Sequence, residues 1–291
     1  MAEHPTVNHI SDTALWVAIY RAMESESAQP LFIDPYARRL GGARGERIVR
    51  EMPHGERFAW PMIVRTAVMD ELIVNAVNGR GVDTVLNLAA GLDARPYRLD
   101  VPATLQWVDA DLPDILDYKE SQLAGEQPKC RLELARVDLI DGLQRRELFE
   151  RVGAAGKNVL VICEGLLVYL HSEQVREIAN DLRARPSFRW WLIDIASPKL
   201  LVMLEKSWGA KLREGGTPFR FAPAEGTAFF EPSGWYEQEF RSTGEEARRL
   251  NRMPTAIRFF GLLGKLQSKE KQQQARRMAG IVMLRSGEVG A

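Results

Sequence analysis

The feature that most constrains the fold is a regular alternation between residues 81 and 197, where short apolar segments alternate with segments of helical pattern. The apolar segments have the length and character of strands, and they are residues 84–90, 105–111, 131–138, 158–166 and 188–195. Three segments between them have helical periodicity, namely residues 111–124, 142–154 and 172–184. This alternation predicts an α/β fold in which a parallel sheet carries helices on both faces.

The sequence on either side of this region predicts additions to the sheet. Residues 1–80 are expected to form a helical extension, because Ser11 and Asp12 suit the N-cap of one helix and Pro61 suits the start of another. After Ser197 the alternation stops, and residues 199–275 are rich in aromatic and arginine residues interrupted by glycine and proline, which is typical of an insertion or lid. Residues 279–286 have the pattern of one more strand, so the chain is expected to return to the sheet.

Charge and composition exclude several classes of partner. Lys plus Arg and Asp plus Glu number 39 each, so the formal net charge is zero and a nucleic-acid-binding surface is not expected. The two cysteines, Cys130 and Cys163, are too few for a disulfide framework or a metal site, and Cys163 is expected to be inert core. The sequence contains no signal pattern and no run of about 18 apolar residues, so we expect a cytoplasmic protein with no membrane partner. The oligomeric state stays open.

The loop after the first predicted strand has the composition of a ligand-binding loop. It lies within the stretch NLAAGLDARPYRL, and its centre is Ala90 and Gly91. In open α/β sheets, ligands bind beyond the carboxyl ends of the strands, and a glycine there lets the backbone turn and approach a ligand closely. For the glycine alone, a tight turn without a ligand is an equally good interpretation.

Acidic residues near the strand ends favour a nucleoside with a positive charge. Asp111 lies 20 positions after Gly91 (111 − 91), where a carboxylate can accept hydrogen bonds from both ribose hydroxyls. Asp138 ends the third strand, and with Leu139 it can bind an adenine amino group and cover the ring. The loop lacks the G-x-G-x-x-G pattern of a pyrophosphate site, and Asp93 would repel a pyrophosphate but would suit a cation. These residues therefore favour S-adenosylmethionine, which carries an adenosine, an ammonium and a sulfonium.

Several motifs, in this order and spacing, resemble the leucine carboxyl methyltransferase family, and more narrowly its bacterial branch, which includes polyketide carboxyl O-methyltransferases. They are TALWVAIYRAMES, LFIDPYARRL, NLAAGLDARPYRL, VDADLPDILDYK, ARVDL and CEGLLVYL. The resemblance runs from about Thr13 to Tyr169 and fades over the C-terminal third. It implies a Rossmann-like class I methyltransferase sheet in a single domain over residues 1–291. The implied parts are a helical N-terminal cap (1–80), a donor-binding core (81–198), a lid insertion for the acceptor (199–275) and a final strand (276–291).

The resemblance also implies a donor site and its members. The implied donor-binding residues are Arg65, Ala90, Gly91, Asp93, Asp111, Asp138, Leu139 and Glu164. Arg65 would grip the donor carboxylate, and Glu164 would meet the methionine moiety or its ammonium. Asp111 would hold the ribose, with Asp109 as the competing candidate, and Thr13 stands where the family uses a basic residue. No catalytic residue is assigned, and no metal is expected.

The predicted activity is O-methyl transfer from S-adenosyl-L-methionine to a small-molecule carboxylate or hydroxyl group. A carboxylate acceptor needs no general base, whereas a phenol would want one, commonly histidine, and the chain has only 4 histidines. The alternatives are a nucleotide-dependent oxidoreductase and a catalytically idle module that only binds the donor.

The side chains of the predicted lid could wall an apolar acceptor pocket. The aromatic candidates are Trp208, Phe219, Phe221, Phe229, Phe230, Trp235 and Tyr236. For any one of them, a place in a local core is an almost equally good interpretation. Arg220 or Arg258 could orient an acceptor carboxylate. Near the donor loop, Arg95 and Arg98 could have a functional role, but the favoured interpretation is that they pair with Asp93 and Asp100 and so stabilise the turn.

Overall fold

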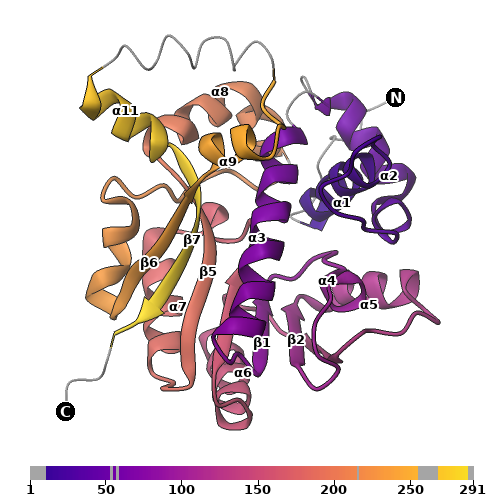
Figure 1. Cartoon of the computed structure of the whole chain (residues 1–291), viewed down its shortest axis with the longest axis vertical. Coiled ribbons are helices and arrows are strands. Elements are labelled where there is room, and N and C mark those ends of the chain that lie inside the picture. The colour runs from indigo at the N-terminus through magenta and orange to yellow at the C-terminus, as the bar shows by residue number, and fades with distance from the viewer. Residues whose placement is uncertain (1–10, 53–54, 57–58, 215, 255–267, 288–291) are drawn as a thin grey trace.

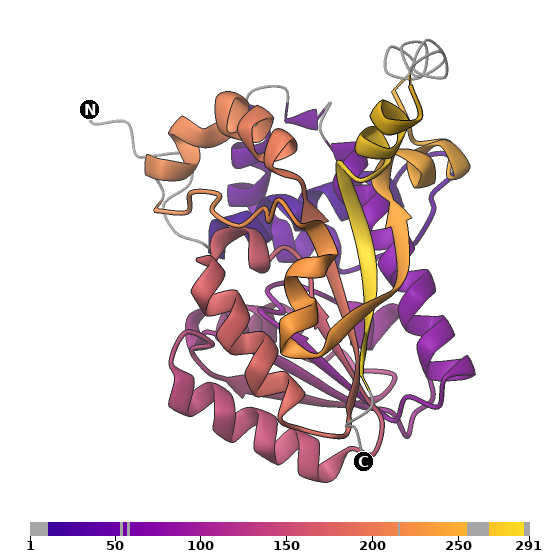
Figure 2. The same ribbon diagram turned by 90° about the vertical axis from the view of Figure 1, so that its left-hand side faces the viewer.

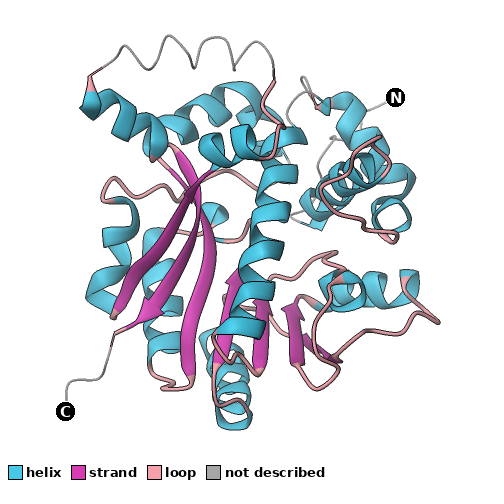
Figure 3. Cartoon of the chain, viewed as in Figure 1, coloured by secondary structure: helices cyan, strands magenta, loops and turns pink. Residues whose placement is uncertain are grey.

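A seven-stranded sheet with the strand order β3-β2-β1-β4-β5-β7-β6 forms the centre of the computed structural model (Figures 1 and 3). The structure describes residues 11–52, 55–56, 59–214, 216–254 and 268–287. The strands are β1 (Thr84–Leu88), β2 (Gln106–Asp111), β3 (Arg131–Arg136), β4 (Val159–Cys163), β5 (Phe188–Ala196), β6 (Trp235–Ser242) and β7 (Ala279–Ser286). The first five strands are parallel, β7 is antiparallel to β5, and β6 is antiparallel to β7. The strand order reverses between β1 and β4, which is where α/β sheets of this kind bind ligands.

All six strands expected from the sequence are present, and β6 is an addition that the sequence did not predict. β6 is an edge strand, and the residues in its first half after Trp235 are exposed. Its sequence, WYEQEFRS, therefore lacks the apolar run or regular alternation by which a strand is predicted. Trp235 at its start is fully buried and supplies the anchor. Since β6 falls within residues 199–275, part of the segment expected to be a lid extends the sheet instead.

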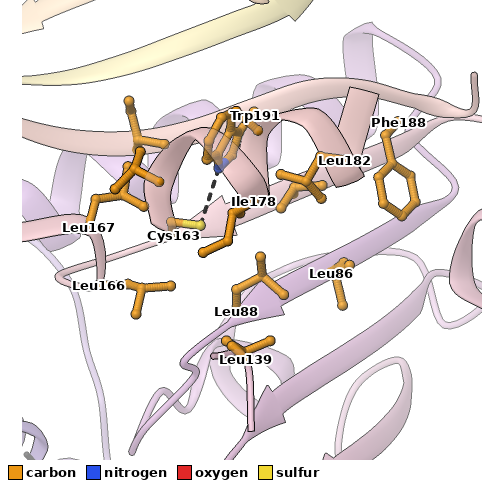
Figure 4. Close-up of a cluster of buried hydrophobic side chains, with 14 of the residues drawn as sticks. Leu86, Leu88, Leu139, Cys163, Leu166, Leu167, Ile178, Leu182, Phe188 and Trp191 are labelled. Atoms are coloured by element: carbon orange, nitrogen blue, oxygen red, sulfur yellow. Dashed lines mark hydrogen bonds between the residues drawn. The ribbon is translucent and has the colours of Figure 1, made fainter. Parts of the chain in front are cut away.

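Helices cover both faces of the sheet, as the alternation predicted. They are α3 (Ala59–Gly79) and α9 (Thr243–Arg249) on one face, and α6 (Gly142–Ala155) and α7 (Ser172–Arg183) on the other. The short helices α4 (Arg95–Arg98) and α5 (Pro113–Gln122) follow β1 and β2. Figure 4 shows the core on the α7 side, where the indole N–H of Trp191 donates to the sulfur of Cys163 at 3.2 Å. Cys163 is therefore core, as expected, and burial raises the pKa of its thiol to about 12.

The N-terminal helices α1 (Ser11–Ser25) and α2 (Ala37–Glu51) pack against each other beside the sheet (Figure 1). The sequence predicted α1 but not α2, because α2 contains the adjacent glycines Gly41 and Gly42, which are typical of turns. These glycines instead allow close helix contact, since a Cβ at Gly41 would lie 2.5 Å from the Ile19 side chain. Gly42, with φ of 54°, kinks the helix.

The remaining elements follow β4 and β5 in the sequence. They are η2 (Leu167–Tyr169), α8 (Pro198–Glu214), η3 (Gly226–Ser233) and α11 (Lys269–Arg276). Helix α8 lies at the same end of the molecule as α1 and α9 (Figures 1 and 2). Within the described ranges, no helix has both the length and the apolar character needed to cross a membrane.

Candidate active site

A cavity of about 830 Å³ lies beyond the carboxyl ends of the parallel strands. Its walls come from the loops after β1, β2, β3 and β4, from α1 and α3, and from α8 and α9. Single-ligand sites range from about 300 to 1,000 Å³, so this volume is large enough for an extended donor with space left beside it. All eight residues that the sequence singled out for the donor site line this one cavity.

The Asp111 carboxylate fixes the backbone of the loop after β1 through hydrogen bonds. The N–H groups of Gly91 and Leu112 donate to separate oxygens of this carboxylate, at 2.7 and 2.8 Å. Gly91 has a φ of 49°, which favours glycine, and a Cβ there would lie 3.1 Å from the Cβ of Ala14 on α1. Burial raises the pKa of Asp111 despite these hydrogen bonds. Each carboxylate oxygen retains acceptor capacity, so Asp111 can bind two further donors from the cavity.

Asp109, the competing candidate for the ribose, is in a different environment. It is fully buried and does not line the cavity. It accepts hydrogen bonds from the Lys119 ammonium at 2.7 Å, from the Trp107 indole at 2.9 Å and from the Asn87 amide at 3.1 Å. Because its oxygens are occupied inside the protein, Asp109 is a structural ion-pair partner, and Asp111 is the acid that faces the cavity.

The loop after β3 forms the open end of the cavity. The Asp138 carboxylate is exposed and accepts a hydrogen bond from the N–H of Ile140 at 2.9 Å. Leu139 is buried, whereas Ile140 is 47% exposed. An exposed acid beside an apolar surface suits the edge and face of a purine.

A buried chain of ion pairs lies under the donor loop. The Arg95 guanidinium contacts Asp93 at 2.7 Å, Asp70 at 2.6 Å and Glu164 at 2.6 Å. The Arg95–Asp93 pair is thus confirmed. The expected Arg98–Asp100 pair is wrong, since Arg98 is turned inward and pairs with Asp70 at 2.6 Å.

Arg65 continues this chain of ion pairs to the strands on the other side of the donor loop. It contacts Glu164 at 2.9 Å and Asp194 at 3.0 Å. Asp194 also accepts a hydrogen bond from the N–H of Gly165 at 2.7 Å. The sequence analysis did not identify Asp194. It lies near the end of the predicted strand 188–195, and an acid near the end of a strand is the signal that identified Asp111 and Asp138.

This chain of ion pairs has more carboxylates than guanidiniums. Arg65, Arg95 and Arg98 face Asp70, Asp93, Glu164 and Asp194, which leaves one negative charge in excess among these described residues. Burial would raise the pKa of Glu164, but the guanidiniums of Arg95 and Arg65 outweigh burial and lower it. Glu164 therefore stays ionised at neutral pH, and the excess of carboxylates in the wall formed by Asp93, Glu164 and Asp194 suits a cation.

Two aromatic contacts close the cavity on the side of α1 and α8. The rings of Trp16 on α1 and Trp208 on α8 meet edge to face, with centroids 5.9 Å apart. Tyr169 packs against Phe219 with centroids 5.6 Å apart, and its hydroxyl is hydrogen-bonded to Thr13. Burial raises the pKa of Tyr169 to about 12. These four aromatic residues line the cavity, so α1 and α8 cover it together.

The predicted aromatic wall is confirmed only in part. Trp208, Phe219 and Phe221 line the cavity. Phe229, Phe230 and Trp235 instead pack into the sheet core around Trp191 and Phe221. Tyr236 is 49% exposed.

Of the two arginines expected to orient an acceptor carboxylate, the structure describes one. Arg220 is exposed outside the cavity, and its Nη1 lies 2.6 Å from Nε2 of His171. Arg258 lies outside the described residues.

Comparison with known proteins agrees with this architecture and places the chain in a family. The structure resembles solved class I methyltransferases, including a "putative methyltransferase" from Thermobifida fusca, with a TM-score of 0.58 and 14% identity over 97% of this chain and 96% of that one. A DUF574 family protein from Streptomyces avermitilis gives a TM-score of 0.56 at 13% identity, over 93% of this chain and 96% of that one. At this identity the likeness shows the fold, an α/β sheet of class I methyltransferase type.

The sequence profile described as leucine carboxyl methyltransferase matches residues 14–183, more than half of the chain. The chain therefore belongs to the leucine carboxyl methyltransferase family and is an S-adenosyl-L-methionine-dependent methyltransferase. A "Putative S-adenosyl-L-methionine-dependent methyltransferase" from Mycobacterium bovis is 32% identical over 253 residues, 78% of this chain and 76% of that one. A relative of the same name from Mycolicibacterium paratuberculosis is 35% identical over 187 residues, which span 60% of this chain and 62% of that one. The oxidoreductase alternative is set aside.

The residues around the cavity fit S-adenosyl-L-methionine. Asp111 has free acceptor capacity for ribose hydroxyls, and Leu139 and Ile140 offer an apolar surface for the adenine. The wall of Glu164 and Asp194 offers the excess negative charge that an ammonium requires.

Proposed function

We propose that this protein transfers the methyl group of S-adenosyl-L-methionine to a carboxylate oxygen of a small molecule. When bound, S-adenosyl-L-methionine supplies an electrophilic methyl group on its sulfonium. Asp111 is proposed to hold the ribose, Asp138 and Leu139 to frame the adenine, and Arg65, Asp93 and Glu164 to surround the methionine moiety. Ala90 and Gly91 form the floor beneath it.

The protein's main contribution to the reaction is to hold the two reactants in line and to exclude water. Fixing two molecules in a reactive geometry is worth roughly 7–11 kcal/mol of the barrier in favourable cases. Helices α1 and α8 cover the cavity through the Trp16–Trp208 contact, which shields the reacting groups from solvent. No proton needs to move when the acceptor is a carboxylate, because that group is already ionised at neutral pH.

The choice of a carboxylate acceptor rests on one observation: the acidic side chains that could act as a general base are engaged in ion pairs. Glu164 and Asp194 both bond to Arg65, and the pKa of Glu164 is lowered by its guanidinium partners. A carboxylate with a lowered pKa is a poor general base for a hydroxyl group. His171, the histidine that the described residues include, contacts Arg220 outside the cavity lining. A hydroxyl acceptor is therefore the second candidate.

The test uses S-adenosyl-L-methionine labelled on the methyl group and a panel of carboxylic acids, phenols and alcohols. A methyl ester releases labelled methanol in mild alkali, whereas a methyl ether retains its label. Alkali-labile product from the carboxylic acids supports the proposal, and alkali-stable product from the phenols or alcohols contradicts it. Donor binding without transfer to any member of a broad panel would favour the idle binding module.

A further inference from the structure

The cavity has a second half that the donor residues do not line, and its chemistry differs from that of the donor half. This second half, called here the acceptor half, is built by the first turn of α3, by α8 and α9, by Met253 and by the start of β7 with the residues before it. Its lining is almost wholly apolar and includes four methionines, Met62, Met203, Met253 and Met278. Methionine side chains are flexible and polarisable, so such a wall adapts to apolar molecules of varied shape.

One charged side chain lines the acceptor half among the described residues, and it is Arg248 on α9. Its neighbours in sequence and space are neutralised: Arg241 and Arg249 pair with Glu246 at 2.8 and 2.5 Å, and both contact Glu71. The Arg248 guanidinium forms no ion pair or side-chain hydrogen bond with another described residue. It is exposed at the edge of the cavity, so its charge is available to a ligand.

Two carboxylates that line the cavity, those of Asp194 and Glu164, bond to other groups than Arg248. Asp194 and Glu164 are held by Arg65, Arg95 and the N–H of Gly165 in the donor half. Helix α9 follows β6, which lies beyond β7 and β5 in the sheet, so Arg248 stands on the side of the cavity away from β1. The two halves are thus electrostatically opposite: the donor half has an excess of negative charge, and the acceptor half has one unneutralised positive charge.

We propose that Arg248 binds an anionic group on the acceptor, distinct from the carboxylate that is methylated, and that the apolar body of the acceptor lies along the methionines of the acceptor half. This inference rests on the proposed methyl transfer, because only that reaction makes the ligand of this half a methyl acceptor. A guanidinium matches a carboxylate with two parallel hydrogen bonds, whereas it offers an uncharged alcohol much less. The acceptor class is therefore an apolar molecule with two anionic groups: Arg248 binds one, and the other is the carboxylate that receives the methyl group. Arg248 determines specificity and takes no part in the chemistry.

The experiment measures binding rather than turnover, and it uses the full chain saturated with S-adenosylhomocysteine. The probes are decanoate, below its micellar concentration, and decanol, which has the same apolar chain without the charge. Binding is followed by tryptophan fluorescence, since Trp16, Trp60 and Trp208 line the cavity. Arg248→Gln should weaken decanoate binding about tenfold or more, because a hydrogen bond to a charged group is lost, and should leave decanol unchanged.

The controls separate a specific site from general charge. Arg248→Lys should keep part of the affinity for decanoate, since the ammonium retains the charge but not the planar fork. Arg276→Gln removes an exposed arginine of α11 that pairs with Glu245 and lies outside the cavity lining, and it should change nothing. Raising the salt concentration should weaken decanoate binding to the unmodified chain and spare decanol.

Four results would overturn the inference, and the first three come from comparing affinities. They are equal affinity of the unmodified chain for decanoate and decanol, unchanged decanoate affinity in Arg248→Gln, and an equal loss in Arg276→Gln. Failure of the unmodified chain to bind decanoate would overturn it too. Each of these results leaves the proposed methyl transfer standing if labelled ester still forms with another acid, so the two proposals fail separately.

Discussion

Asp111 and Asp109 lie two residues apart on β2, yet removing Asp111 should mainly weaken donor binding, whereas removing Asp109 should mainly lower the stability of the fold. Asp111→Ala removes a carboxylate that faces the cavity, whereas Asp109→Ala removes one that neutralises the buried ammonium of Lys119. If Asp111 holds the ribose, its loss removes charge-assisted hydrogen bonds worth about 1.5–3 kcal/mol, which weakens donor binding about 10- to 150-fold. Stability should change less, because the freed N–H groups of Gly91 and Leu112 lie beside the cavity and can be hydrated.

For Asp109→Ala we expect mainly a loss of stability. Lys119 is 1% exposed, and leaving a buried charge without its partner costs about 3–5 kcal/mol. That is a large part of the roughly 5–15 kcal/mol that stabilises a typical protein. Calorimetric titration with S-adenosylhomocysteine measures the first effect, and urea unfolding measures the second. A folded Asp111→Ala variant that binds S-adenosylhomocysteine as tightly as the parent would refute the assignment of the ribose to Asp111.

Three further predictions follow from buried groups. Arg95→Met leaves three carboxylates without their shared partner and should cost about 3–5 kcal/mol in urea unfolding. Arg136→Met breaks only exposed pairs and should cost far less, and equal costs would contradict the role of the buried chain of ion pairs. Burial raises the pKa of Glu164, but Arg95 and Arg65 outweigh burial and hold it below its unfolded value. The stability that Glu164 contributes is therefore present above about pH 4.3 and is lost as the pH falls towards the folded pKa, and a Glu164→Gln chain with the same acid dependence as the parent would disprove this. The buried thiol of Cys163, with its pKa raised to about 12, should react with a thiol reagent only after unfolding, and rapid labelling of the native chain at this residue would show that the core opens.

The donor half of the cavity was predictable because its signals are local. A glycine directly after one strand and acids at the ends of the next two can be recognised in short windows of sequence, and the parallel sheet then brings them to one edge. Asp194 carries a similar local signal near the end of the fifth predicted strand, but it lies beyond Tyr169, where the family resemblance that implied the donor residues fades. Asp109 was the harder case: it looks like Asp111 in sequence, and two residues along a strand it points to the same face. Only the position along β2 separates the two acids, because Asp111 ends the strand at the cavity and Asp109 lies buried within it.

The interactions among these residues could not be predicted, because they join distant parts of the chain. Arg65 meets Asp194 across 129 positions of sequence, and nothing near either residue marks the other as its partner. Arg98 shows the same limit, since a nearby acid, Asp100, was the natural partner in sequence and Asp70 on α3 is the partner in space. Helix α2 and strand β6 were missed for a related reason: packing against α1 and against β7 stabilises segments whose own sequences signal a turn or a lid.

The acceptor half shows most clearly why function is harder to predict here than fold. Its wall is assembled from the start of α3, from α8, from α9 and from the start of β7, so no two neighbouring motifs define it. The aromatic residues that drew attention in the sequence divide between the cavity and the sheet core, because a hydrophobic side chain carries no sign of which surface it will cover. A charge is more informative, since most arginines around α9 find carboxylates and Arg248 does not. No carboxylate of a described residue neutralises Arg248, and an anionic acceptor is the ligand that the proposed methyl transfer would bring to it.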